Sequence, residues 1–259
     1  MAETIKVRRE GQIVKVLLNR PEAYNALDPE LIRSFTAHMV SLADDESVRG
    51  VVISGEGKAF CAGGDLKWAT SFPKGVPAAF HQLAGRFHQG ILEIRRMAKP
   101  VIAAVNGVAA GGGFSLALAC DFRVMARSAS FKQAYTSAGL SIDGGGTFTL
   151  PRLVGLARAL EVAAFDRPIP ADQAWAWGLV TKVVDDGHAV DEAVNMAQEL
   201  ARISMNSFGW SKQLLTDSFN TPFEAHIERE RAGISACAAH PDGQEGIKAF
   251  VEKRKPTFY

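Results

Sequence analysis

The chain contains a buried-strand pattern, Val101–Val105, that leads within a few residues into three consecutive glycines, Gly111–Gly113, and then into an Ala/Leu-rich helical pattern. Glycines at a helix start leave backbone N–H groups bare, and these groups together with the positive end of the helix dipole favour negative charge. A second turn of this kind, Gly63–Gly64, follows the β-rich run 50–54. Because parallel strands align their carboxyl ends at one sheet edge, we expect both turns to converge on one carbonyl oxygen of a ligand.

The remaining patterns alternate between strand and helix. Residues 13–18 alternate apolar and polar and indicate a strand. A helix is expected after it, with Asp28 as N-cap and Pro29 at the first helical position. Such alternation predicts an α/β fold in which a parallel sheet is flanked by helices over the first two-thirds of the chain.

Proline and glycine punctuate the later segments. A Pro/Gly-interrupted stretch from Phe72 to Pro77 indicates a surface loop, and the pattern from about Ala79 to Met97 predicts a helix. Beyond Pro151 the β pattern fades and mostly helical patterns follow, so the last third is expected to be helical.

Composition limits the classes of partner. The 259 residues fit one large domain or a main domain with a smaller C-terminal part, and 29 basic against 28 acidic residues suggest no nucleic-acid or membrane-surface partner. No run reaches the ~20 apolar residues of a membrane span, and the start lacks a signal-peptide pattern, so we expect a cytoplasmic protein. Cys61, Cys120 and Cys237 have no Cys-x-x-Cys spacing and the histidines no ligand spacing, so neither a disulfide framework nor a metal site is expected.

Several further motifs, taken in order along the chain, resemble the crotonase superfamily, which is the enoyl-CoA hydratase/isomerase family. The resemblance runs from about residue 10 to the end of the chain. In addition to the two glycine turns, it is carried by PVIAAVNG at 100–107, GLxxDGGGT at 139–147, LPRLVG at 150–155, AxxWGLV at 174–180 and AFVEKR at 249–254.

The resemblance implies a crotonase-like spiral of ββα units with a helical C-terminal trimerisation region. Residues 1–200 would form the spiral core with the CoA-thioester site, and residues 201–259 the C-terminal helical region. The implied partners are an acyl-CoA thioester and further copies of the chain, in a homotrimer or a dimer of trimers. No separate cofactor is implied, because coenzyme A enters as part of the substrate.

The resemblance also assigns residues to the substrate. The backbone N–H groups of Gly64 and Gly112 would hold the thioester oxygen, where negative charge grows in the transition state. An adenine-binding region would contact CoA through Ala23, Ala62 and Leu66. The C-terminal helix would contact CoA through Phe250 and Lys253.

Two positions depart from a typical hydratase of this family. Ser115 and Tyr135 stand where such a hydratase carries the two glutamates that position and deprotonate water. Neither side chain is an ordinary general base near neutral pH, so the sequence does not support water addition by two carboxylates. We expect both residues to line the substrate pocket instead.

Asp143 lies where many family isomerases keep an acidic residue. One carboxylate suffices to take a proton from one carbon and return it to another, so the sequence favours an enoyl-CoA double-bond isomerase. A structural alternative is that Asp143 caps the helix leading to Leu150.

His88 supports a second chemical alternative. Together with Asp143 and Tyr135, its position resembles the catalytic His, Asp and Trp of the 4-chlorobenzoyl-CoA dehalogenase branch, although tyrosine replaces the tryptophan. In that branch the aspartate attacks the ring and the histidine activates water, which would make the chain an aroyl-CoA dehalogenase or hydrolase. His88 as an ordinary surface or core residue is the structural alternative.

A third alternative is a non-catalytic member that binds CoA esters, RNA or a partner protein, since both hydratase glutamates are missing. The intact glycine turns argue against lost catalysis, and the near-neutral charge argues against RNA, whose binders usually carry a basic patch.

Overall fold

A mixed six-stranded sheet forms the base of the computed structural model, which describes residues 3–258. Its strand order is β1-β2-β3-β5-β7-β10, with β1 antiparallel to β2 and the other neighbours parallel. The strands are β1 (Ile5–Glu10), β2 (Ile13–Leu18), β3 (Gly50–Gly55), β5 (Val101–Val105), β7 (Phe122–Ala126) and β10 (Lys182–Val184). The expected α/β class with a largely parallel sheet is therefore confirmed.

A second, smaller sheet gives the chain its spiral path. Its order is β4-β6-β8-β9, formed by β4 (Ala59–Cys61), β6 (Val108–Ala110), β8 (Ser130–Lys132) and β9 (Ile169–Pro170). The chain passes from a long strand of the first sheet to a short strand of the second, and then into helices: α2 (Leu66–Ser71) and α3 (Gly75–Arg96), then α4 (Gly112–Ala119), then α5 (Gly146–Phe165). Three successive turns of this path are the expected ββα units.

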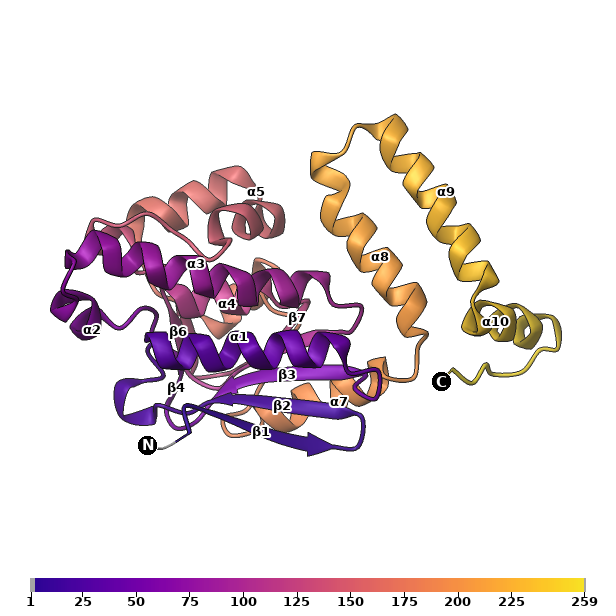
Figure 1. Cartoon of the computed structure of the whole chain (residues 1–259), viewed down its shortest axis with the longest axis horizontal. Coiled ribbons are helices and arrows are strands. Elements are labelled where there is room, and N and C mark those ends of the chain that lie inside the picture. Colours follow the sequence, from indigo (N-terminus) through magenta and orange to yellow (C-terminus); the bar gives the residue numbers. More distant parts are fainter. Residues whose placement is uncertain (1–2, 259) are drawn as a thin grey trace.

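Helices cover the main sheet. Helix α1 (Pro29–Asp44) begins as predicted, with the Asp28 side chain accepting a 2.8 Å hydrogen bond from the Leu31 N–H. It lies alongside α3 above the sheet (Figure 1), whereas α7 (Ala189–Leu200) packs on β3, β5 and β7. One face of α1 is apolar and buried, and it is formed by Leu31, Ile32, Phe35, Met39 and Leu42.

The predicted surface loop at 72–77 is shorter than expected, because α3 begins at Gly75. Pro77 then lies in the first turn of this helix, where its missing N–H would have had no intrahelical acceptor. The loop therefore comprises only residues 72–74, and α3 brings its first turns over the glycine turns. Between residues 3 and 258, no helix is both long and apolar enough to cross a membrane.

The last helices extend away from the sheets (Figure 1). These three helices are α8 (Met205–Asp217), α9 (Phe223–Ala239) and α10 (Pro241–Val251). The short helix α6 (Ala171–Ala176) and α7 precede them in the chain. The buried Lys212 of α8 donates 2.7 Å hydrogen bonds to the Ile94 carbonyl of α3 and to the Asp121 carboxylate. This contact fixes α8 on the core, while α9 packs on α8 and α10 packs on α9.

Candidate active site

The two glycine turns lie in contact, as the sequence predicts. They follow β4 and β6, which are parallel neighbours with Cys61 opposite Ala109. Gly63 has a φ of +95°, and a Cβ atom at this residue would lie 3.0 Å from the Ala110 oxygen and 3.2 Å from the Gly112 nitrogen. Only glycine allows this backbone conformation and this approach without strain.

The N–H groups of Gly64 and Gly112 remain available at this junction. Gly112 is the first residue of α4, so its N–H is among those without an acceptor inside the helix. Over the described residues 3–258, neither of the two N–H groups donates to another part of the chain. The residue Leu27 holds the first turn in place, donating to the Gly63 oxygen at 2.7 Å and accepting from the Asp65 N–H at 3.0 Å.

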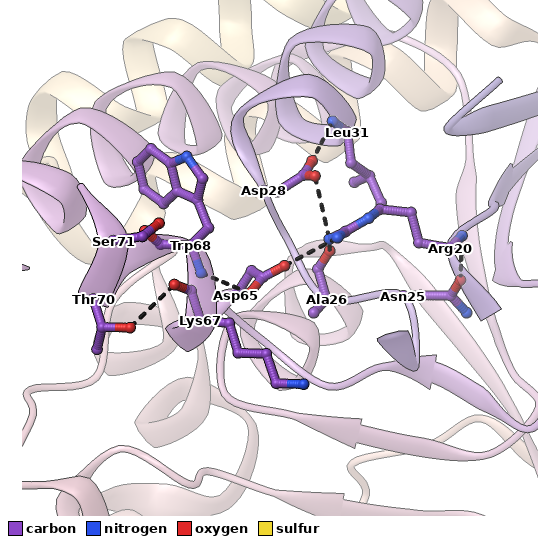
Figure 2. A network of polar contacts seen from close by, with 10 residues as sticks. All are labelled: Arg20, Asn25, Ala26, Asp28, Leu31, Asp65, Lys67, Trp68, Thr70 and Ser71. Atoms are coloured by element: carbon purple, nitrogen blue, oxygen red, sulfur yellow. Dashed lines mark hydrogen bonds and ion pairs between the residues drawn. The ribbon is translucent and has the colours of Figure 1, made fainter. Parts of the chain in front are cut away.

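Arg20 connects the first glycine turn to the segment before α1 (Figure 2). Its guanidinium donates to the Asp65 carboxylate at 3.0 Å and to the Ala26 carbonyl at 2.6 Å, and it lies 3.4 Å from Asp28. Asp65 in turn accepts from the Trp68 N–H at 3.0 Å and thereby caps α2. One half-buried cation therefore fixes the segment next to Gly64. The sequence analysis missed this residue.

A cavity of about 480 Å³ opens at the two turns, and Gly64 and Gly112 both line it. Apolar side chains of α3 form most of the wall, including Val76, Phe80 and Phe87. Asp143 is the only carboxylate among the described residues that line the cavity, and Tyr135 lies beside it. An apolar space with a few convergent polar groups is typical of a small-molecule site.

Asp143 and Tyr135 are joined by a hydrogen bond. The Tyr135 hydroxyl donates to Oδ1 of Asp143 at 2.6 Å and lies 3.3 Å from the Ser115 hydroxyl. Burial raises the pKa of Tyr135 well above its ordinary value, and the neighbouring Asp143 charge raises it further. Tyr135 is therefore a neutral phenol that orients the carboxylate, and it lines the cavity as expected.

Comparison with known proteins identifies the family to which this site belongs. The family model described as enoyl-CoA hydratase/isomerase matches residues 8–259 of the chain. The chain belongs to the enoyl-CoA hydratase/isomerase family. This membership confirms the crotonase resemblance and implies an acyl-CoA thioester as the substrate.

Relatives in the enoyl-CoA hydratase/isomerase family carry different reaction names. The chain is 35% identical over 259 residues to the 1,2-epoxyphenylacetyl-CoA isomerase of Escherichia coli (strain K12), covering 100% of this chain and 99% of that protein. It is 34% identical over 258 residues to the crotonyl-CoA hydratase of Syntrophomonas wolfei, covering 99% and 98%. The crystal structure of an enoyl-CoA hydratase from Polaromonas sp. matches with a TM-score of 0.93 at 39% identity, covering 98% of this chain and 99% of that one. The names of these relatives therefore do not determine which reaction the side chains of this chain catalyse.

Ser115 does not line the cavity, contrary to our expectation. It lies in α4, is fully buried and faces the Tyr135 hydroxyl from behind. Its oxygen fills the space against Gly146, where a Cβ atom would approach it to 2.7 Å. Ser115 is therefore connected to Asp143 through the hydroxyl group of Tyr135.

Asp143 does not cap α5, so the alternative interpretation of Asp143 as the cap of the helix leading to Leu150 is wrong. Gly145 occupies the N-cap position, and no side chain accepts a hydrogen bond there. The Asp143 carboxylate turns instead toward Tyr135 and His88, and 38% of its side chain is exposed.

His88 lies beside Asp143, with its Nε2 atom 3.8 Å from Oδ2 of the carboxylate. The same Nε2 accepts a 3.2 Å hydrogen bond from the Gly144 N–H. The imidazole faces a second cavity, of about 400 Å³, that it shares with Arg95 and Phe148. The structure therefore brings His88 next to the predicted acid–base residue, at the boundary between two cavities.

The three residues of the expected adenine-binding region lie near the first glycine turn but outside the cavity. The Ala62 N–H donates to the Tyr24 carbonyl at 3.0 Å, which joins the segment containing Ala23 to the end of β4. Leu66 opens α2 and is exposed. These residues form an outer surface beside Gly64.

Phe250 and Lys253 lie far from the cavity of their own chain, so the expectation that they contact CoA is not met within one chain. Helix α10 packs on α9, at the end of the molecule opposite α2 (Figure 1). The Phe250 side chain is 85% exposed. The direction of the last helices depends on their packing, which the motif at 249–254 does not encode.

Cys61 lies beside the first glycine turn but has no sign of reactivity. It is fully buried, and this burial raises the pKa of its thiol to about 12.

Across residues 3–258, no group of three or more His, Cys, Asp or Glu side chains is arranged to hold a metal ion.

Proposed function

We propose that the chain is an enoyl-CoA double-bond isomerase in which Asp143 carries the proton. One observation carries this proposal: the cavity that Gly64 and Gly112 both line contains a single carboxylate among its described residues. Water addition in the manner of a two-glutamate hydratase needs a second group to position and deprotonate water. Proton transfer between two carbons of one substrate needs only one base.

In the proposed reaction the thioester oxygen accepts hydrogen bonds from the N–H groups of Gly64 and Gly112. Asp143 removes a proton from the α-carbon of a 3-enoyl-CoA, and the negative charge moves to the thioester oxygen as an enolate. Asp143 then returns the proton to the γ-carbon, which yields the conjugated 2-enoyl-CoA. Each N–H donor of this type typically contributes ~3–4 kcal/mol, because it meets a charge that is fully developed only in the transition state.

The surroundings of Asp143 suit this role. Tyr135 donates to Oδ1, so Oδ2 is the carboxylate oxygen that receives no hydrogen bond from the described residues and is left to take the proton. The apolar α3 wall, including Phe80 and Phe87, limits the access of water to the enolate. The reaction moves one proton and shifts the double bond without net oxidation or reduction, so coenzyme A enters only as part of the substrate.

The test is conversion of a 3-enoyl-CoA, followed by the absorbance of the conjugated thioester, with wild type and Asp143→Asn. We expect turnover in wild type and a loss of at least about a hundredfold in the variant. Asp185→Asn is the matched control, because Asp185 is an exposed carboxylate that pairs with Arg127 at 3.2 Å. Equal activity of Asp143→Asn and Asp185→Asn would refute the proton-carrying role.

A second candidate function, an aroyl-CoA dehalogenase or hydrolase, is favoured by the 3.8 Å approach of His88 to Asp143. In that chemistry Asp143 forms an ester with the aromatic ring, and His88 activates the water that hydrolyses it. Rapid quenching with 4-chlorobenzoyl-CoA, digestion and peptide mass analysis tests it. An added aroyl mass on the Asp143 peptide supports this chemistry, and an unmodified peptide at every quench time excludes it for this substrate.

We further propose that the C-terminal helices meet other copies of the chain in a homotrimer or a dimer of trimers. Large apolar side chains are exposed there, namely Phe219, Phe223, Ile234, Phe250 and Val251. A monomer rarely exposes so many apolar groups in one region. Light scattering of wild type and Phe250→Ser tests the assembly: a trimer or hexamer that dissociates in the variant supports it, and a monomeric wild type refutes it.

A further inference from the structure

Asp143 has polar contacts with Tyr135 and with His88, and only the contact with His88 connects the carboxylate to solvent. Oδ1 accepts from Tyr135, which contacts Ser115, and both of these side chains are buried. This branch ends inside the protein. Oδ2 faces His88, whose side chain is 47% exposed and lines the second cavity.

The two cavities lie on opposite sides of the Asp143–His88 contact. The first is lined by Asp143 and the second by His88, and no described residue lines both. An acyl group that fills the first cavity covers the open side of Asp143 but leaves His88 in contact with the second cavity. His88 is then the remaining polar connection between the carboxyl group and water.

The Gly144 N–H determines which imidazole nitrogen can receive a proton. Because Nε2 accepts this hydrogen bond at 3.2 Å, it carries a lone pair, and Nδ1 holds the proton of the neutral ring. Nε2 is also the atom that lies 3.8 Å from Oδ2 of Asp143. Proton transfer between these two atoms requires a ring movement that releases the Gly144 N–H and shortens the 3.8 Å distance.

We propose that His88 relays the proton of Asp143 to and from water in the second cavity while acyl-CoA occupies the first. In the relay the O–H bond at Oδ2 breaks and an N–H bond forms at Nε2, while the proton on Nδ1 passes to water. The reverse sequence returns a solvent proton to Asp143. This inference rests on the proposed isomerase function, because it concerns the proton that Asp143 holds between the two carbons.

The test measures deuterium in the product and in recovered substrate when a 3-enoyl-CoA reacts in D₂O. The ratio of deuterium incorporated to product formed reports exchange at Asp143 independently of total turnover. We expect His88→Gln to lower this ratio about tenfold or more, since the amide oxygen can still accept from Gly144 but cannot relay a proton. His38→Gln is the control, because His38 lies in α1 and lines neither cavity.

A second variant tests the route without changing His88. Leu92→Trp places an indole in the second cavity, which Leu92 lines, and should also lower the deuterium ratio. Unchanged ratios in His88→Gln and Leu92→Trp would overturn the relay even if isomerisation is normal. Deuterium exchange into recovered substrate that depends on His88, without any isomerised product, would instead support the relay and overturn the isomerase assignment.

Discussion

Oδ1 of Asp143 accepts a 2.6 Å hydrogen bond from the hydroxyl of Tyr135, eight positions earlier in the chain. The two residues reach each other across the 3-10 helix η2 (Thr136–Ala138), and Tyr135 is almost fully buried where it lines the cavity. From the family resemblance, Tyr135 is expected to occupy one of the two positions at which a typical hydratase has a glutamate. In this chain the residue at that position, Tyr135, carries no carboxylate and instead orients the carboxylate of Asp143.

Loss of the Tyr135 hydroxyl should therefore reduce turnover more than binding. A hydrogen bond to a charged group is worth ~1.5–3 kcal/mol, so Tyr135→Phe should lower kcat about tenfold to a hundredfold. KM for the acyl-CoA should change little, because the hydroxyl orients Asp143 and does not hold CoA. Steady-state kinetics of Tyr135→Phe and of Tyr24→Phe, which changes an exposed tyrosine, provide the comparison. A main effect on KM would contradict the orienting role.

The raised pKa of Tyr135 predicts a stability effect at alkaline pH. In the unfolded chain a tyrosine ionises near pH ~10, whereas burial and the Asp143 charge keep the folded phenol protonated above that pH. The folded state then binds more protons than the unfolded state, so the free energy of unfolding falls as pH rises. Urea unfolding at about pH 9 and about pH 11 should show a steeper fall for wild type than for Tyr135→Phe. Parallel slopes would mean that Tyr135 ionises normally.

The contact between the glycine turns predicts a large effect of one methyl group. In Gly63→Ala the new Cβ approaches the Ala110 oxygen to 3.0 Å at a φ of +95°, which must displace the neighbouring Gly112 N–H. A displacement of about 1 Å at such a donor can cost about a hundredfold in rate, so we expect kcat to fall by about that factor.

Gly178→Ala is the matched control for this substitution. Gly178 also has a positive φ, of +74°, but a Cβ atom there would meet nothing within 4 Å. Both variants should lose ~1–3 kcal/mol of stability from backbone strain, and only Gly63→Ala should lose activity. A similar kcat in the two variants would show that the contact between the turns is not needed for catalysis.

Sequence patterns located the long strands and α1 because each has enough residues to show periodicity. The strand predicted at 13–18 is β2, and those at 50–54 and 101–105 coincide with β3 and β5. The short strands β4 and β6 contain three residues each, which is too few to show alternation. The glycine turns directly follow these short strands and not β3 and β5, from which the sequence prediction placed them side by side.

Long-range pairs of side chains were not predictable in the same way. The Arg20–Asp65 pair spans 45 positions, and no local pattern connects its members. The contact between His88 and Asp143 also depends on how α3 lies over the turn before α5. For Phe250 the family motif gave a role, but the packing of α8 to α10 determines where the residue lies. Local sequence fixes elements and caps, whereas these relationships depend on the assembled chain.

The buried pair of Lys212 and Asp121 should dominate the attachment of α8 to the core. Asp121 accepts from Lys212 at 2.7 Å and from the Val101 N–H at 2.8 Å, and burial raises its pKa. Removing one partner leaves the other charge buried and unpaired, so Lys212→Met should cost ~3–5 kcal/mol in the free energy of unfolding. The double variant Lys212→Met with Asp121→Asn should recover part of this loss, because no unpaired charge remains.

Arg229→Met removes the half-exposed partner of Asp217 and should cost no more than ~1 kcal/mol. Urea unfolding of the four proteins measures these differences. If Lys212→Met and Arg229→Met cost the same, packing along α8 rather than the buried ion pair holds the helix in place.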